Sequence, residues 1–221
     1  MKLSKRLQAI FQMVKPGSVI ADIGCDHGLL PIALVQEKVC KWAYACDLRE
    51  GPLHKAIDMI AKYDLQDRVI PLLRNGIQDL PEGIDTIVIA GMGFETIKMI
   101  LEQSFSDLHK YNQFIIQSNT DVDKLRYWLC KHGFSIVDED IVYEGHYYQV
   151  ISFSYQDEPI MLSEEDCLFG VKLYEHPLFR QMWEYNLKKA SDILQQIPSS
   201  SFNYKYMEQY KNCIEVKLYK K

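Results

Sequence analysis

The segment ADIGCDHGLLP, residues 21–31, places three chemically reactive side chains between two glycines. Cys25, Asp26 and His27 are consecutive, and their types would suit a nucleophilic cluster, a metal site or a ligand-binding turn. Catalytic triads are assembled in space, whereas neighbours in a tight turn point in different directions. A metal ion would need more ligands than this turn offers. Cys25 is therefore expected to be a small packing residue, and His27 either contacts a ligand or supports the loop.

The same segment has the pattern D-x-G-x-x-x-G, formed by Asp22, Gly24 and Gly28 after a short apolar run. Glycines at a strand-to-helix turn let a ligand approach the backbone closely, and the following helix offers unpaired N–H groups. The dinucleotide fingerprint G-x-G-x-x-G has a glycine where this chain has Asp26, and a carboxylate there would repel a pyrophosphate. An acid suits instead a cofactor with cationic groups, such as the ammonium and sulfonium of S-adenosylmethionine. Turn formation and helix capping are the alternative roles of Asp22 and Asp26.

Polar or glycine-rich residues also follow four other apolar segments, at Asp47, Asn75-Gly76, Gly91–Gly93 and Gln117–Asn119. Ligands of open parallel sheets bind beyond the carboxyl ends of the strands, so these residues are expected along one edge. Asp47 stands 19 residues after Gly28, where doubly wound folds place the acid that binds ribose hydroxyls. Its alternative role is to cap the next helix. Asn75 either contacts an adenine edge or simply forms an Asn-Gly turn.

The elements that would position these residues alternate between helix and strand. Strands are expected over 18–23, 41–47, 67–73, 84–91 and 113–119, and helices over 4–14, 28–36, 51–63, 94–102 and 122–133. Two further strands, 134–145 and 146–155, form a hairpin around Gly145-His146. This order predicts an α/β fold with a Rossmann-like, mostly parallel sheet whose last strand is antiparallel.

The pattern changes after Pro159. Ser163 and Asp166 resemble a capping box, and His176-Pro177 is expected to end the helix that they begin. Two later helices, separated by a turn at 198–201, carry apolar residues spaced by three and four. They predict a C-terminal helical hairpin that resembles an antiparallel coiled coil. We therefore expect two domains, residues 1–160 and 161–221.

Charge is unevenly distributed along this chain, whose net charge is −5. From Arg180 to Lys221 there are eight Lys and Arg against four Asp and Glu, and the segment is rich in tyrosine. A basic surface with aromatic residues can hold RNA, although solvated helix faces have a similar composition. No signal peptide, membrane span or C-x-x-C pair is apparent. These features predict a cytoplasmic protein with reduced thiols and no metal site.

ADIGCDHGLLP resembles the DIGSDHAYLP signature of the bacterial tRNA (adenine-N1) methyltransferases that modify adenosine 22, the TrmK family. The neighbouring motifs LSKRL, GPLHKA, IVIAGMG, QSN and LRYWLCKHGF are similar to that family too, so the resemblance covers residues 1 to about 155. This chain departs from the family pattern in several places. Cys25 replaces a serine, Gly28-Leu29 replaces Ala-Tyr, Phe94 replaces a glycine, and Ser118 replaces a proline. Phe94 and Ser118 are expected to flank the substrate pocket.

The resemblance implies a class I methyltransferase that transfers a methyl group from S-adenosylmethionine to N1 of adenine in tRNA. The expected cofactor-binding residues are Asp22, Gly24, Cys25, Gly28, Asp47, Leu48, Asn75, Gly76, Ala90, Gly91 and Met92. The expected catalytic residues, which would hold the adenine, are Asp26, His27, Gly93 and Asn119.

The C-terminal hairpin is expected to grip tRNA phosphates through Lys188, Lys189, Lys205 and Lys211. Its alternative role is packing or dimerisation, although a monomer is favoured. Two other functions stay open at this point: methylation of another RNA position or a small molecule, and cofactor binding without catalysis. A nicotinamide oxidoreductase is disfavoured by the missing glycine of the first turn.

Overall fold

The computed structural model describes residues 1–156 and 160–219. It contains two compact units, Met1–Leu173 and Tyr174–Lys221, which are described separately below. Within the described residues, no helix combines the length and the apolar character that a membrane crossing requires.

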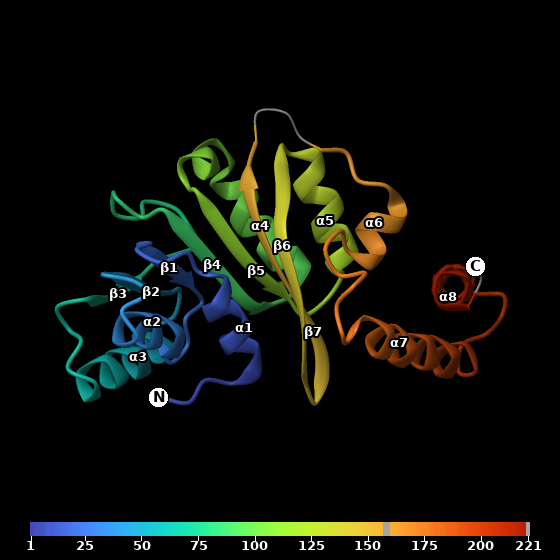
Figure 1. Cartoon of the computed structure of the whole chain (residues 1–221), viewed down its shortest axis with the longest axis horizontal. Helices are drawn as coiled ribbons and strands as arrows, with labels where there is room; N and C mark the ends of the chain where they lie inside the picture. The colour runs from blue at the N-terminus through green and yellow to red at the C-terminus, as the bar shows by residue number, and fades with distance from the viewer. Residues whose placement is uncertain (157–159, 220–221) are drawn as a thin grey trace. The chain divides into compact units, whose positions relative to one another are not determined.

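The first unit is built on a seven-stranded sheet (Figure 1). In spatial order its strands are β3 (Val69–Leu73), β2 (Ala43–Asp47), β1 (Ile20–Ile23), β4 (Thr86–Met92), β5 (Gln113–Ser118), β7 (His146–Tyr155) and β6 (Phe134–Glu144). The first five are parallel, and β7 runs antiparallel to both β5 and β6. The predicted antiparallel last strand is therefore confirmed, and it lies between β5 and β6. The strand order reverses between β1 and β4, which is the position where such sheets bind ligands.

Helices cover both faces of this sheet. They are α1 (Lys5–Met13), α2 (Leu29–Gln36) and α3 (Glu50–Lys62) on one face, and α4 (Phe94–Gln103) and α5 (Val122–Lys131) on the other. All four residues of β1 are buried, with Ile20 in one apolar cluster and Ala21 in the other. Burial on both faces is why the parallel strands read as continuous apolar runs. A short 3₁₀ helix, Phe105–Lys110, lies before β5 and was not predicted.

A buried ion pair attaches α6 (Glu164–Phe169) to the sheet unit. The guanidinium of Arg126 donates to Glu139 across 2.6 Å and to the carbonyl of Cys167 across 3.0 Å. Glu139 also accepts from the backbone N–H groups of Val171 and Lys172. These bonds explain why the first compact unit extends to Leu173, beyond the expected boundary at residue 160.

The capping box of α6 is confirmed, because Ser163 and Asp166 bond to each other's backbone N–H groups. The predicted end of this helix at His176-Pro177 is wrong. The helix ends at Gly170, whose φ of +86° is in the left-handed region. A Cβ atom there would lie 3.0 Å from the Arg126 guanidinium, so the chain turns tightly against the buried ion pair.

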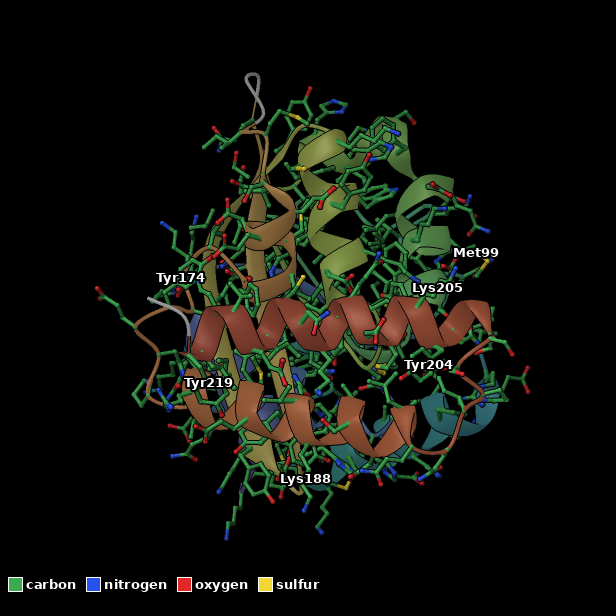
Figure 2. The ribbon with its side chains drawn as sticks, turned by 90° about the vertical axis from the view of Figure 1, so that its right-hand side faces the viewer. Met99, Tyr174, Lys188, Tyr204, Lys205 and Tyr219 are labelled. Atoms are coloured by element: carbon green, nitrogen blue, oxygen red, sulfur yellow. The ribbon has the colours of Figure 1, made fainter. Side chains whose placement is uncertain are left out.

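The second unit is a pair of helices, α7 (Phe179–Leu194) and α8 (Phe202–Tyr219), which Figure 2 shows side by side. The Trp183 and Tyr210 rings are 6.4 Å apart between centroids, and Arg180 lies over the Tyr219 ring. The start of α7 thus meets the end of α8, so the helices are antiparallel. Trp183 on α7 and Ile214 on α8 are both buried. The predicted helical hairpin is confirmed.

Candidate active site

The turn after β1 is anchored to the neighbouring strand β2. The N–H groups of Gly24 and Cys25 both donate to the Cys46 carbonyl, across 2.8 and 3.0 Å. Gly28 has a φ of +64°, and a Cβ atom on it would lie 3.2 Å from Cβ of Ala56 in α3. A glycine is therefore needed there both for the backbone conformation and for the close packing of the turn on α3.

Asp26 and His27 lie at the exposed tip of this turn. Asp26 has a left-handed φ of +50°, and its side chain is 65% exposed. The His27 side chain is 44% exposed, and its Nε2 lies 3.5 Å from the Asp26 carboxylate. Cys25 is buried in the apolar core, and burial raises the pKa of its thiol. Cys25 is thus a packing residue, as expected, and Asp26 and His27 are the residues of the turn whose side chains are open to a ligand.

Asp22 is a buried acid at the end of β1. Its pKa is raised to about 7, mainly by burial and also by the nearby Asp47 carboxylate, while Arg6 acts in the opposite direction. A group with this pKa is poised between its neutral and ionised forms at neutral pH. A cationic ligand group beside Asp22 would favour the ionised form.

Asp47 is buried at the end of β2 and accepts a hydrogen bond from the N–H group of Arg49, across 2.9 Å. This bond shapes the turn before α3, whose N-cap is Arg49 and has no side-chain cap, so Asp47 does not cap that helix. Leu48, the next residue, is 64% exposed and offers an apolar surface beside the acid. Asn75 is exposed after β3, and Gly76 takes the φ of +66° that an Asn-Gly turn requires.

Gly91 is the extra residue of a β-bulge at the end of β4, where Ala90 pairs with Gln117 and Met92 pairs with Ser118. Its φ is +79°, which a glycine adopts without strain. The bulge also brings Met92 against the first turn, where its side chain occupies the space that a Cβ on Gly24 would need.

A closed ring of hydrogen bonds between amide groups of Gly91, Gln117 and Asn119, here called the amide ring, joins the ends of β4 and β5. The Gly91 N–H donates to Oε1 of Gln117 across 3.0 Å, Nε2 of Gln117 donates to Oδ1 of Asn119 across 3.0 Å, and Nδ2 of Asn119 donates to the Gly91 carbonyl across 2.7 Å. Asn119 keeps one N–H group and one lone pair for other partners. Gln117 is fully buried; it belongs to the strand-end pattern, but it was not among the expected cofactor-binding or catalytic residues.

Arg6 is the second residue that the sequence analysis missed. Its Nη1 donates to Oε1 of Gln117 across 2.6 Å, and its guanidinium lies 5.6 Å from the centre of the Tyr148 ring. A Cβ atom on Gly91 would lie 2.9 Å from Nη1 of Arg6. Arg6 makes no ion pair with any residue in the described part of the chain. Its motif, LSKRL, carried a signal only through the family resemblance, because α1 lies far from β4 and β5 in sequence.

Phe94 and Ser118, which are expected to flank the substrate pocket, both have buried side chains. Phe94 is buried in the apolar cluster beneath α4, and its N–H donates to Oγ1 of Thr120. Ser118 is buried too, with its hydroxyl donating to the Thr120 carbonyl across 2.6 Å. Gly93, the N-cap of α4, has an ordinary extended conformation and lies between these groups and the bulge. The two departures from the family motifs therefore change packing beneath the site.

The described residues contain no cluster of His, Cys, Asp and Glu that could hold a metal ion. The chemistry available at the edge is therefore that of two buried acids, one unpaired guanidinium, an amide ring and exposed backbone. An adjacent acid and cation suit a ligand that carries both charges, such as an α-amino acid group. The buried Asp47 and exposed Leu48 suit a ribose and the face of a base.

Comparisons with known proteins agree with this arrangement. A family model described as a methyltransferase domain matches residues 3–151. The tRNA (adenine(22)-N(1))-methyltransferase of Bacillus subtilis is 31% identical over 210 residues, which are 91% of this chain and 88% of that protein. Mycoplasma capricolum TrmK in complex with S-adenosylhomocysteine has a TM-score of 0.87 at 33% identity, covering 99% of this chain and 98% of that one. The B. subtilis m1A22 tRNA methyltransferase TrmK has a TM-score of 0.85 at 27% identity, covering 98% and 99%.

Proposed function

This chain belongs to the tRNA (adenine(22)-N(1))-methyltransferase family, and on that premise we propose which of its residues perform the reaction. It is an S-adenosylmethionine-dependent methyltransferase that acts on N1 of adenine 22 in tRNA. The observation that supports the proposal is that the buried Asp22 carboxyl group feels the charge of the Arg6 guanidinium at the switch point of the sheet, because an acid and a cation in one site complement the two charges of the cofactor's amino acid group.

The cofactor-binding residues divide by chemistry. Asp22 holds the ammonium group, Arg6 holds the carboxylate, and the free oxygen of Asp47 accepts from a ribose hydroxyl. In this proposal Leu48 covers one face of the adenine ring, and the exposed Asn75 contacts the ring edge. Gly24, Cys25, Gly28, Gly76, Ala90, Gly91 and Met92 shape the surface through backbone conformation and close packing.

When bound, S-adenosylmethionine supplies an electrophilic methyl group. Adenine N1 is unprotonated at neutral pH and carries an in-plane lone pair, so the residues of the site need not remove a proton from it. Their task is to orient the base and to accommodate the positive charge that the ring acquires. Asn119 offers one N–H group and one lone pair to the edge of the base, and the exposed carboxylate of Asp26 stabilises the charge. Gly93 supplies backbone at the same place, and His27 orients Asp26.

The helical hairpin supplies basic side chains for tRNA phosphates. Lys188, Lys189 and Lys205 are exposed, and Figure 2 shows Lys188 on α7 and Lys205 near the start of α8. Lys211 is half-buried and lies 3.3 Å from Glu215, so its charge is already partly balanced. N1 is on the Watson–Crick edge, so the target base must leave its stack to reach the site. The enzyme would meet its tRNA in the cytoplasm.

The test is methylation of unmodified tRNA transcripts with adenosine or guanosine at position 22, followed by mass spectrometry of the nucleosides. We expect 1-methyladenosine only in the transcript that has adenosine 22. Modification of both transcripts would move the target to another position. Binding of S-adenosylhomocysteine without methyl transfer to either transcript would indicate a cofactor-binding protein that does not act on tRNA.

A further inference from the structure

The hairpin of β6 and β7 extends beyond the carboxyl edge of the sheet (Figure 1). The register between β5 and β7 runs as far as the pair of Gln117 with Val150. Beyond that pair, β6 and β7 continue together to Glu144 and His146 at the turn. The hairpin tip, residues 141–149, therefore projects past the strand end that carries the amide ring of the active site.

Contacts with α1 hold the hairpin tip in place. The Glu144 carboxylate accepts from the backbone N–H groups of Lys5, across 3.0 Å, and Arg6, across 3.5 Å. Val142 is buried in the apolar cluster that includes α1, and the Tyr148 ring lies beneath the Arg6 guanidinium. Two-stranded ribbons are only marginally stable alone, so these contacts give the tip a defined conformation beside the site.

The face of the tip that is turned away from α1 carries a pair of tyrosines. Tyr143 and Tyr147 are cross-strand partners, with ring centroids 4.8 Å apart and planes tilted by 48°. Successive side chains of a strand alternate between faces, so this pair lies opposite Val142 and Tyr148. Tyr143 is 46% exposed, which leaves part of its ring available to another molecule.

We propose that Tyr143 and Tyr147 form a stacking platform for an unpaired tRNA base next to the adenine that is methylated. This inference rests on the proposed function. Extrusion of the target base leaves its neighbours without a stacking partner, and aromatic side chains stack on unpaired bases of any sequence.

The composition of the tip favours stacking over phosphate binding. Residues 141–149 contain no lysine or arginine, and the acid Glu144 already bonds to the start of α1. The platform should therefore contribute to tRNA binding without changing its salt dependence, unlike the lysines of the helical hairpin.

Alanine and phenylalanine variants test the platform. We expect Tyr143→Ala, Tyr147→Ala and the double variant to raise the tRNA KM by about 5- to 50-fold, the range that loss of base stacking produces. Tyr143→Phe and Tyr147→Phe should stay within about threefold of the wild type, because the ring is kept. Tyr127→Ala is a matched control, since Tyr127 is 55% exposed on α5. S-adenosylhomocysteine affinity, measured by calorimetry, should be unchanged in all of them and shows that each variant is folded.

A second readout uses tRNA with 2-aminopurine beside nucleotide 22. Wild-type protein and the phenylalanine variants should quench its fluorescence by stacking, and the double alanine variant should not. An unchanged tRNA KM in the double alanine variant would overturn the proposal. A phenylalanine variant whose tRNA KM rises as much as that of the alanine variant would overturn it too. A change of oligomeric state in the double variant, measured by light scattering, would reassign the tip to contacts between copies. If wild-type protein quenches the probe but methylates no tRNA, the proposed reaction fails and the platform stands.

Discussion

The side-chain amide of Gln117 donates to Oδ1 of Asn119 across 3.0 Å, so a buried residue determines how an exposed one presents its amide. The Gly91 backbone closes the ring from the other side. A flip of the Asn119 amide, which would exchange its oxygen and nitrogen, would break both of these hydrogen bonds. The orientation that a substrate would meet is therefore set before the substrate arrives.

Removal of the Gln117 amide should lower turnover. Gln117→Leu keeps much of the volume but loses both bonds of the ring, so we expect kcat for tRNA methylation to fall by about 10- to 100-fold. The affinity for S-adenosylhomocysteine should change less than kcat, because Tyr148 and the start of α1 still hold Arg6. Single-turnover kinetics with saturating tRNA measure the effect.

Gln113→Leu is the matched control, because Gln113 is a buried glutamine on the same strand whose amide bonds to Met13 and Ser152. It should reduce stability and leave kcat close to that of the wild type. Equal losses of kcat in the two variants would mean that the amide ring has no particular role in catalysis.

Cofactor affinity should depend on the ionisation of Asp22, whose pKa burial raises to about 7. The ionised carboxylate is the form that binds an ammonium group, so affinity should rise between pH 6 and 8, with proton release from Asp22 on binding. Calorimetry in buffers of different ionisation enthalpy measures that release. The Asp22→Asn variant should bind the cofactor more weakly at pH 8, and its cofactor affinity should no longer rise between pH 6 and 8 through this group. The ligand's own titration is common to both proteins, so a parallel pH profile in the variant would contradict the role of Asp22.

The same shift affects stability without cofactor. The folded-state pKa of Asp22 lies above its ordinary value of 3.8, so the folded protein binds the proton more tightly. The resulting stabilisation is fully present below about pH 4 and is lost as the pH rises through about 7. The difference in unfolding free energy between wild type and Asp22→Asn should therefore vary across this window and level off above it.

Arg6 should strengthen the binding of ligands that carry a carboxylate and have little effect on ligands that lack one. Arg6→Ala removes a charged hydrogen-bond donor, so we expect its affinity for S-adenosylhomocysteine to fall by about 10- to 100-fold. Binding of 5′-methylthioadenosine, which lacks the amino acid group, should be nearly unchanged. Arg6→Lys should recover part of the loss, because it restores charge without the planar donor geometry. An equal weakening of both ligands would show instead that Arg6 supports the whole pocket.

Neutralising the exposed lysines of the helical hairpin should weaken tRNA binding. Lys188→Gln and Lys205→Gln should each reduce the salt dependence of the binding constant by about one unit of slope. Lys211→Gln should have a smaller effect, because that ammonium group already pairs with Glu215. Filter binding over a range of salt concentrations measures the slopes. Identical slopes in all three variants and the wild type would restrict the hairpin to packing or dimerisation.

Breaking the Arg126–Glu139 pair should destabilise the sheet unit. Both side chains are fully buried, and Arg126→Met would leave an uncompensated carboxylate, at a cost of about 3–5 kcal/mol of unfolding free energy. Arg180→Met, which breaks an exposed pair with Glu184, should cost less than about 1 kcal/mol. Urea denaturation of the full chain measures both. A loss in Arg126→Met no greater than in the exposed control would show that the pair is dispensable.

Local patterns were sufficient for most of the secondary structure. The helical period of α1, the apolar runs of β1 and β4, and the Gly-rich turns identified the elements within a few residues of their ends. The prediction for α6 failed because Gly170 ends that helix against Arg126, a residue 44 positions away. Proline at 177 was the stronger local signal, and it carried no information about this distant contact.

The sequence alone determined the α/β class, the polar residues at the strand ends and, through its motifs, the resemblance to a family of tRNA methyltransferases. Each of these depends on neighbours or on short spacings. Tertiary structure decided that Arg6 and Gln117 join the site, that Phe94 and Ser118 lie beneath it, and that β7 inserts between β5 and β6. Those facts follow from which distant segments pack together. A half-buried arginine and a buried glutamine acquire their roles only from partners that the fold brings within hydrogen-bonding distance.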